Sequence, residues 1–263
     1  MDFLTEIIAK KRGRLEQAKA ARPLEALRGE AFDARRDAVS HAFSAALKRK
    51  DRINVIAEFK RASPSKGTIS GAADPAHTAR AYEAGGAAGI SVLTEEDYFQ
   101  GSLGDLRAVR AATRLPLLRK DFIFDEYQLY EAAAAGADAL LLIVAALDDE
   151  TLVRLRRIAE DELGMDALTE VHTRDELRRA TNCGATFIGI NNRDLHSFNV
   201  SLDVSIKLIE DAPQNMTFVS ESGLREQKDL HRLRALGFQG FLIGETLMRT
   251  DEPEQALRAL IFD

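Results

Sequence analysis

The sequence predicts an α/β protein in which eight strand–helix units close into one parallel barrel, preceded by a helical extension. Three observations support this. From residue 53 onward, eight short runs rich in Val, Ile and Leu alternate with stretches of helical period. The runs are apolar throughout, as parallel strands covered on both faces are. The length of 263 residues suits a single (β/α)8 barrel. An open, doubly wound sheet is the alternative.

The extension is expected to occupy residues 1–50. Its first part carries apolar side chains at the spacing of an amphipathic helix that packs on the rest of the protein, namely Phe3, Leu4, Ile7, Ile8 and Leu15. A second helical stretch, HAFSAALKRK, precedes the first strand. No Pro- or Ser-rich linker separates it from the barrel at 51–263, so 1–263 is expected to form a single domain.

The expected strands follow one another at regular intervals. In chain order they are INVIAEF, GISVLT, LPLLRK, ADALLLIV, MDALTEV, TFIGIN, MTFVSE and GFLIGE. Turn residues such as Gly89, Pro116 and Gly240 stand at their N-terminal ends.

The segments after these strands show the apolar period of helices that cover a barrel. They are AHTARAYEAGG, LGDLRAVRAAT, DEYQLYEAAAAGA, DDETLVRLRRIAEDELG, TRDELRRATNCG, LDVSIKLIEDA, LREQKDLHRLRALG and EPEQALRALIF. Several end in a glycine that suits a left-handed C-cap, as in EAGG, AAGA and ALG.

Composition and charge narrow the expected partners. The net charge of −6 comes without a block of like charges, so neither nucleic acid nor an anionic membrane is expected as a partner. No apolar run reaches the roughly 18 residues of a membrane span, and the N-terminus lacks the pattern of a secretory signal. A cytoplasmic protein is therefore expected, and the chain is expected to be a monomer.

Metal and disulfide chemistry are not expected. The single cysteine, Cys183, lies in an ordinary helix-to-strand segment and is interpreted as structural. The histidines lie on separate segments without the spacing of zinc ligands: His41, His77, His172, His196 and His231. His172 follows Glu170 and is interpreted as a loop residue rather than a base.

Ionisable and polar residues gather at the C-terminal ends of the expected strands, where barrels of this architecture place their active sites. These are Glu58, Lys60, Lys120, Glu170, Asn191, Arg193, Glu221 and Ser222. A single ionisable residue at a strand end is usually exposed to solvent or belongs to a structural ion pair. Here, however, five strands contribute such residues to the same rim of the barrel, and this predicts a shared site. Side chains two residues apart share a face, so Glu58 and Lys60 are both expected to point toward the barrel mouth.

The loops after the last two strands suggest an anion site. Gly223 and Gly244 follow strands seven and eight, where barrel enzymes commonly hold phosphate through backbone N–H groups. Tight turns alone would also explain these glycines. Two lysines and two or three glutamates around one anion suit proton transfer, because an ammonium group donates to a carbonyl oxygen and a carboxylate takes up or returns protons. A small phosphorylated substrate is expected.

Eight motifs in register resemble the indole-3-glycerol-phosphate synthase family of tryptophan biosynthesis, over nearly the whole chain. They are EFKRASPSKG, SVLTEEDYFQGS, LPLLRKDFIFDEYQ, LLLIVAALDD, LTEVH, IGINNRDLHSF, VSESGL and FLIGETLMR. The resemblance implies a carboxy-lyase that closes 1-(2-carboxyphenylamino)-1-deoxyribulose 5-phosphate to an indole with loss of carbon dioxide and water. It implies no cofactor and no metal.

The resemblance also implies roles for particular residues. Lys120 would be the general acid at the ribulose carbonyl, Glu170 the partner in proton transfer during dehydration, and Lys60 the second lysine. The other implied residues hold substrate or support the rim: Glu58, Ser63, Asn191, Arg193, Glu221, Ser222, Gly223, Gly244 and the backbone of Glu245. Phe99 and Phe122 lie just past the second and third strands, where they either wall the aromatic ring or pack the loops.

Two competing functions differ in their expected residues. A phosphoribosylanthranilate isomerase would be expected to use a cysteine and an aspartate at strand ends, and the sequence has neither there. A non-catalytic barrel would keep the anion loops without needing Lys120 and Glu170 together.

Glu245 stands where several relatives carry serine, so its carboxylate is expected to repel the anion. The composition of 63–67, SPSKG, favours a mobile lid.

Overall fold

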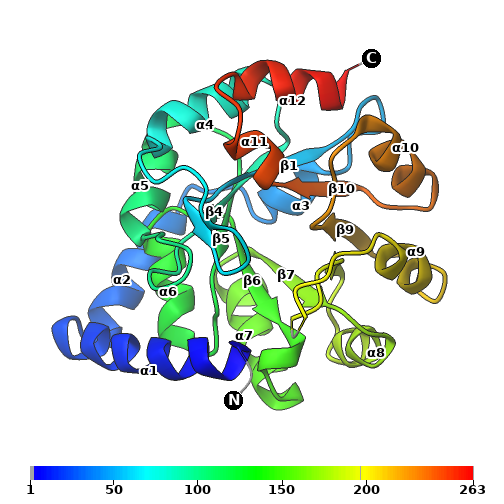
Figure 1. Ribbon diagram of the computed structural model, residues 1–263. Coiled ribbons are helices and arrows are strands. Elements are labelled where there is room, and N and C mark those ends of the chain that lie inside the picture. The colour runs from blue at the N-terminus through cyan, green and yellow to red at the C-terminus, as the bar shows by residue number, and fades with distance from the viewer. Residues whose placement is uncertain (1–2, 196, 263) are drawn as a thin grey trace.

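The computed structural model describes residues 3–195 and 197–262, in which eight parallel strands form a closed barrel (Figure 1). They are β1 (Val55–Phe59), β4 (Gly89–Leu93), β5 (Leu117–Lys120), β6 (Ala139–Ile143), β7 (Asp166–Val171), β8 (Phe187–Asn191), β9 (Thr217–Glu221) and β10 (Gly240–Ile243). Each strand pairs with the next barrel strand along the chain, and β10 closes the ring on β1. The predicted parallel barrel is confirmed, and the open sheet is excluded.

The eight segments predicted as covering helices form helices around the strands. They are α4 (Pro75–Ala84), α5 (Leu103–Ala112), α6 (Glu126–Ala134), α7 (Asp149–Arg157), α8 (Arg174–Asn182), α9 (Asp203–Ile209), α10 (Gln227–Ala235) and α12 (Pro253–Ile261). The glycines predicted to end α4, α6 and α10 do so with positive φ angles.

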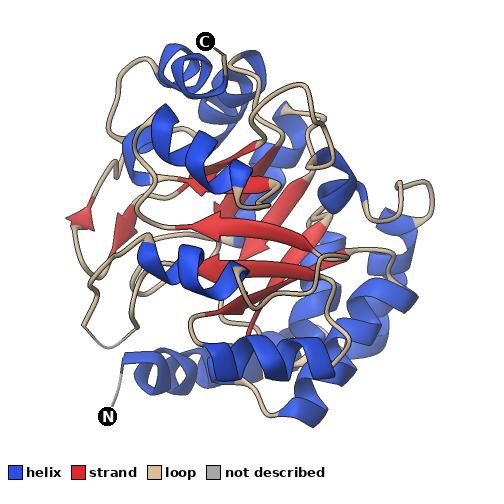
Figure 2. Cartoon of the chain, turned by 90° about the vertical axis from the view of Figure 1, so that its right-hand side faces the viewer, coloured by secondary structure: helices blue, strands red, loops and turns tan. Residues whose placement is uncertain are grey.

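Five short elements were not predicted as separate elements, because each lies inside a loop or continues a longer element. A hairpin of β2 (Ala62–Ser63) and β3 (Gly67–Thr68) follows β1, and α11 (Glu245–Met248) follows β10. A 3-10 turn, η1 (Val144–Ala146), extends β6, and α7 continues as a π turn, η2 (Ile158–Glu162). Figure 2 shows the hairpin at the end of the barrel toward which the strands point.

The barrel interior is filled by alternate side chains of the strands. A buried apolar cluster includes Ile56, Leu118, Leu168, Val219 and Leu242. Since side chains on one face recur every second residue, the positions two residues further along lie above this cluster at the mouth. Those positions are Glu58, Lys120, Glu170, Glu221 and Gly244. The apolar core therefore directs the predicted site residues into one space.

The described part of the extension, residues 3–50, forms three helices, α1 (Phe3–Ala21), α2 (Leu24–Arg35) and α3 (Ala42–Ala46). Helix α2, which was not predicted, packs on α6 and buries Leu27 and Ala31. Phe43 of α3 belongs to the interior cluster, so α3 closes the barrel at the end opposite the mouth. The side chains that α1 buries fully are Ile7, Lys11 and Leu15.

Lys11 is a buried cation on the inner face of α1. Its Nζ lies 2.6 Å from Asp121 Oδ1 and 3.1 Å from Glu96 Oε2. Asp121 directly follows Lys120, and it also pairs with Arg119 at 3.0 Å and accepts a hydrogen bond from Thr94 at 2.6 Å. Burial alone would raise the pKa of Asp121, but Lys11 and Arg119 hold it below its ordinary value. The extension is thus tied to the barrel by a buried ion pair.

Replacing Lys11 by Met is expected to lower the free energy of unfolding by about 3 kcal/mol, because the buried carboxylate of Asp121 loses one of its two cations. Lys10→Met is the matched control, since Lys10 is exposed and pairs with Glu6 and Tyr98 at the surface. Urea unfolding of both variants measures the difference. Equal stabilities for the two variants would contradict a structural role for the buried pair.

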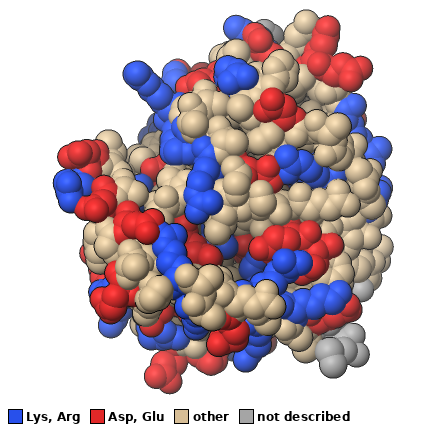
Figure 3. All heavy atoms as spheres, turned by 90° about the vertical axis from the view of Figure 1, so that its left-hand side faces the viewer, with Lys and Arg blue, Asp and Glu red and all other residues tan. Residues whose placement is uncertain are grey.

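The surface carries charges of both signs. Figure 3 shows Lys and Arg interspersed with Asp and Glu over one face. Within residues 3–195 and 197–262, no helix is long and apolar enough to span a membrane.

Candidate active site

A cavity of about 600 Å³ opens at the C-terminal ends of the barrel strands. Every residue that the sequence analysis proposed for the site lines it. They are Glu58, Lys60, Ser63, Phe99, Lys120, Phe122, Glu170, Asn191, Arg193, Glu221, Ser222, Gly223, Gly244 and Glu245. The structure therefore brings together residues from all parts of the barrel, and their individual roles remain predictions.

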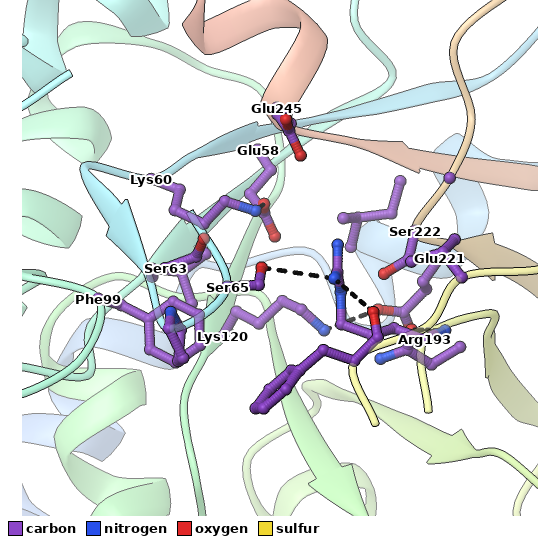
Figure 4. Close-up of a pocket in the computed structure, with 18 of the residues that line it drawn as sticks. Glu58, Lys60, Ser63, Ser65, Phe99, Lys120, Arg193, Glu221, Ser222 and Glu245 are labelled. Carbon is purple, nitrogen blue, oxygen red and sulfur yellow. Dashed lines mark hydrogen bonds and ion pairs between the residues drawn. The ribbon is translucent and has the colours of Figure 1, made fainter. Parts of the chain in front are cut away.

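The centre of the cavity is an ammonium group between two carboxylates. Lys120 Nζ lies 3.0 Å from Glu170 Oε2 and 2.7 Å from Glu221 Oε2. The three side chains come from the ends of β5, β7 and β9, and Figure 4 shows Lys120 reaching across the mouth toward Glu221. Only a closed barrel lets these alternate strands aim at one point.

The two carboxylates differ in their electrostatic state. Burial alone would lower the pKa of Lys120, but Glu170 and Glu221 raise it above its ordinary value, so the ammonium stays charged. Burial acts to raise the pKa of Glu170, yet Lys120 and then His172 bring it below its ordinary value. For Glu221 burial prevails over Lys120, with a further contribution from Glu170, and the pKa rises to about 7.

Glu221→Gln is expected to gain free energy of unfolding, relative to wild type, as the pH rises from 5 to 8. The folded protein binds the Glu221 proton more tightly than the unfolded chain, because the pKa of about 7 exceeds the ordinary value of 4.5. The contribution of Glu221 to stability is therefore fully present below about pH 4.5 and is lost as the pH rises through 7. Glutamine does not titrate and removes this loss.

Urea unfolding at pH 5 and pH 8 measures the effect, with Glu254→Gln on the exposed surface of α12 as the control. Parallel pH dependences in Glu221→Gln and wild type would show that Glu221 is ionised throughout and contradict the prediction.

A second ion pair lies beside the first. Lys60, one residue past β1, donates a hydrogen bond to Glu58 Oε1, so the two side chains share a face as predicted. Gly244 on the neighbouring strand end makes room for this carboxylate, since a Cβ there would lie 2.2 Å from Glu58 Oε1. An alanine at 244 would displace Glu58 from the cavity wall. Gly244 thus has a packing role in addition to any contact with an anion.

The loops after β9 and β10 form the side of the cavity where an anion was predicted. Ser222 adopts a positive φ of 66°, which is uncommon for a residue other than glycine. The buried side chain of Asn192 donates hydrogen bonds to the Glu221 carbonyl at 3.0 Å and the Ser222 carbonyl at 3.1 Å. Asn192 was not predicted as a site residue, because it lies one residue beyond the strand pattern, which ends at Asn191.

Glu245 does not face this region as an unpaired charge. Its Oε1 lies 3.9 Å from Lys66 Nζ and 3.2 Å from an Arg249 nitrogen. The expectation that the carboxylate would repel an anion is therefore too strong, since two cations next to it oppose its charge. Lys66 and Arg249 lie in segments beyond the strand ends. The alternating pattern of the strands therefore could not predict them as site residues.

The polar side chains around Glu170 join the middle of the cavity to the hairpin. The Asn191 side chain lowers the pKa of Glu170, after the larger effects of burial, Lys120 and His172. Asn191 Oδ1 also accepts the backbone N–H of Arg193 at 3.0 Å. Arg193 in turn donates to Ser65 Oγ at 3.4 Å, a contact drawn in Figure 4.

Aromatic side chains form the apolar wall. The rings of Phe99 and Phe122 lie 6.3 Å apart between centroids, and both line the cavity. Phe3 of α1 also lines it and packs edge-on against Phe198, at 5.2 Å. Phe3 and Phe198 were not predicted as site residues, because residues 195 apart in the chain meet only through the packing of the extension.

Metal ligands are not grouped in the described parts of the chain. Within them no set of three or more His, Cys, Asp or Glu side chains could hold a metal ion. His196 lies outside the described residues, and the prediction of metal-free chemistry stays a prediction. Cys183 is buried and unbridged, with its sulfur 3.7 Å from the Asp149 carbonyl oxygen.

Comparison with known proteins gives one family over the length of the chain. Residues 4–260 match the family model described as indole-3-glycerol phosphate synthase. Curated relatives with that name include the proteins of Carboxydothermus hydrogenoformans, 45% identical over 98% of this chain and 99% of the relative, and of Leptothrix cholodnii, 46% identical over 98% of each. The Neisseria meningitidis serogroup B protein is 47% identical over 96% of each chain.

Solved structures share the barrel at much lower identity. Thiamine phosphate pyrophosphorylase from Pyrococcus furiosus matches with a TM-score of 0.59 and 16% identity, over 79% of this chain and 93% of its own. KGPDC from Streptococcus mutans matches with the same score and identity, over 79% of this chain and 95% of its own. These similarities support the fold alone.

Proposed function

The chain belongs to the indole-3-glycerol phosphate synthase family, and on that premise we propose that Lys120, Glu170 and Lys60 carry the proton transfers of its reaction. The enzyme converts 1-(2-carboxyphenylamino)-1-deoxyribulose 5-phosphate to indole-3-glycerol phosphate, a step of tryptophan biosynthesis, with loss of carbon dioxide and water. The isomerase and the non-catalytic barrel considered as alternatives are thereby set aside.

Ring closure requires an acid where the carbonyl oxygen gains negative charge. Lys120 carries a charged ammonium at the centre of the cavity, held by Glu170 and Glu221, and this observation supports the proposal most directly. As the aromatic carbon attacks the ribulose carbonyl carbon, Lys120 Nζ donates a proton to the carbonyl oxygen. Loss of carbon dioxide then restores the aromatic ring.

Dehydration requires a base and a second acid. Glu170 has a lowered pKa and is ionised, so it accepts a proton as water is lost. Lys60, which its ion pair with Glu58 positions in the cavity, donates a proton to the departing hydroxyl group. Asn191 holds Glu170 in place, and Glu221 and Arg193 support the rim around it.

The phosphate of the substrate is proposed to bind where the β9 and β10 loops meet. Ser222 and Gly223 after β9, and Gly244 and Glu245 at the start of α11, line that part of the cavity. Oriented N–H groups at such loops bind phosphate without a cation in direct contact. Ser63 of the hairpin and the rings of Phe99 and Phe122 would contact the remainder of the substrate.

The β2–β3 hairpin is proposed to act as a lid over the bound substrate. Lys66 at its tip is exposed and lies 3.9 Å from Glu245, in the neighbouring loop after β10. A substrate analogue whose ribulose carbonyl is reduced to an alcohol cannot close, and it is expected to slow tryptic cleavage after Lys66. Cleavage at 48–50, at the far end of the barrel, serves as the control. Equal cleavage rates after Lys66 with and without the analogue would contradict closure.

We further propose a single-domain, cytoplasmic monomer that works without a metal or cofactor. The activity itself is tested by mixing the purified protein with the synthetic substrate and following indole fluorescence. A folded protein that binds the substrate without turnover would contradict the proposed function.

A further inference from the structure

His172 is a largely buried titratable residue that the reaction scheme leaves without a role. It follows β7 directly and lies two residues after Glu170, so both side chains leave the strand on the same side. Only 10% of its side chain is exposed. A histidine in such a position is not an ordinary loop residue.

Glu176, in the first turn of α8, fixes the orientation of the ring. Glu176 Oε2 accepts the backbone N–H of His172 at 2.7 Å and lies 3.2 Å from the ring Nδ1. Since a carboxylate accepts and does not donate, Nδ1 carries a proton. The other ring nitrogen, Nε2, then faces Glu170 Oε1 at 3.4 Å, and among the described residues it has no hydrogen-bond partner.

Glu170 and Glu221 compete for the same ammonium group of Lys120. The two carboxyl groups are equally well buried, and each has one oxygen within 3.0 Å of Lys120 Nζ. Their second oxygens differ, because Glu170 Oε1 faces His172, whereas Glu221 Oε1 has no hydrogen-bond partner among the described residues. Lys120 acts on both carboxyl groups, whereas a cationic His172 ring acts mainly on Glu170. The two cations together therefore favour ionisation of Glu170 over that of Glu221.

We propose that His172, held by Glu176, is a positioning residue that keeps Glu170 rather than Glu221 ionised and so assigns the role of base to Glu170. This inference rests on the proposed function of Glu170. The ring acts through its charge, and no bond to the substrate forms or breaks at His172.

The charged groups around His172 support a cationic ring. Glu170 of β7 and Glu176 of α8 contact it, and Glu221 of β9 acts on it across the mouth, with Lys120 as the cation beyond both carboxylates. Burial alone would lower the pKa of His172, but the hydrogen bond with Glu176 and the charge of Glu170 raise it above its ordinary value. These contacts favour the charged, imidazolium form of the ring.

A nuclear magnetic resonance titration of histidine-labelled protein tests the charge of the ring without using catalysis. The midpoint of His172 is expected above its ordinary range and is expected to fall in Glu176→Gln and in Glu170→Gln. Glu150→Gln, in the exposed first turn of α7, is the control and is expected to leave it unchanged. A midpoint at or below the ordinary value of about 6.5 would overturn the inference, whatever the activity.

The pH dependence of kcat/KM tests the consequence. In His172→Gln the acid limb is expected to move to higher pH, because Glu170 loses the second cation and takes up a proton more readily. Each pH unit of movement is about a tenfold loss of activity at the acid end, and activity above the limb is retained. His77→Gln on exposed α4 is the control.

The outcomes separate the two proposals. An active His172→Gln variant with an unmoved acid limb would overturn the role of His172, even if Glu170 is the base. Full activity in Glu170→Gln would overturn the role of Glu170, and the inference that depends on it. If His172→Gln is inactive at every pH, the magnetic resonance titration of Glu176→Gln decides, and an unchanged His172 midpoint there overturns the inference.

Discussion

Replacing Lys120 by Met is expected to lower kcat for indole formation by about 10³-fold, since a positioned general acid contributes roughly 10²–10⁴-fold. Methionine keeps most of the side-chain length but has no proton to give to the ribulose carbonyl oxygen. The substitution also removes the cation that lies between two carboxyl groups. In the wild type, Lys120 Nζ lies 3.0 Å from Glu170 Oε2 and 2.7 Å from Glu221 Oε2. Without this cation the pKa of Glu170 would rise, so a smaller fraction of the carboxyl group would be ionised and able to act as the base.

Indole fluorescence under saturating substrate measures this loss. Lys228→Met on the exposed surface of α10 is the matched control, because Lys228 pairs there with Glu226, far from the cavity lining. Circular dichroism shows whether the Lys120 variant folds. A folded Lys120→Met variant with wild-type turnover would leave the reaction intact and contradict the assignment of Lys120 as the acid.

Replacing Glu170 by Gln is expected to separate the first half of the reaction from the second. Glutamine has nearly the same shape and keeps a hydrogen-bonding oxygen, but it accepts no proton. Dehydration is expected to slow by about 10²–10⁴-fold. Ring closure and decarboxylation depend on Lys120 and are expected to slow much less.

A single-turnover experiment that follows both products measures the separation. Carbon dioxide release is expected to proceed while indole fluorescence lags behind it, whereas the two rise together in the control Glu254→Gln. If carbon dioxide release falls as much as indole formation, Glu170 acts before dehydration and the proposed order of roles is wrong.

The architecture follows from local patterns. Apolar runs separated by amphipathic segments predicted the barrel strands and their covering helices, because a strand buried on both faces has few alternatives to a parallel sheet. Helix α2 was missed, since its buried residues, Leu27 and Ala31, give only a weak apolar stripe. The hairpin and α11 were missed because each has only a few residues and depends on its neighbours.

The site followed from the same patterns only in part. Glu58, Lys120, Glu170 and Glu221 each stand two residues beyond an interior apolar side chain, so strand periodicity and the rule for barrel mouths were sufficient to bring them together. Cations such as Lys66 and Arg249 were not found, because helices and loops place them without any strand period.

The sequence by itself determined the fold class, the end of the barrel that carries the chemistry, and the strand residues that converge there. Side chains along a strand point alternately to its two faces. This is a local property of the chain, and it recurs in all eight barrel strands. The tertiary structure alone decided which carboxylate faces His172, which cation balances Asp121, and that Phe3 reaches the cavity. These pairings depend on distances of a few ångströms between residues far apart in the chain. Electrostatic energies change steeply over such distances, and no local pattern encodes them.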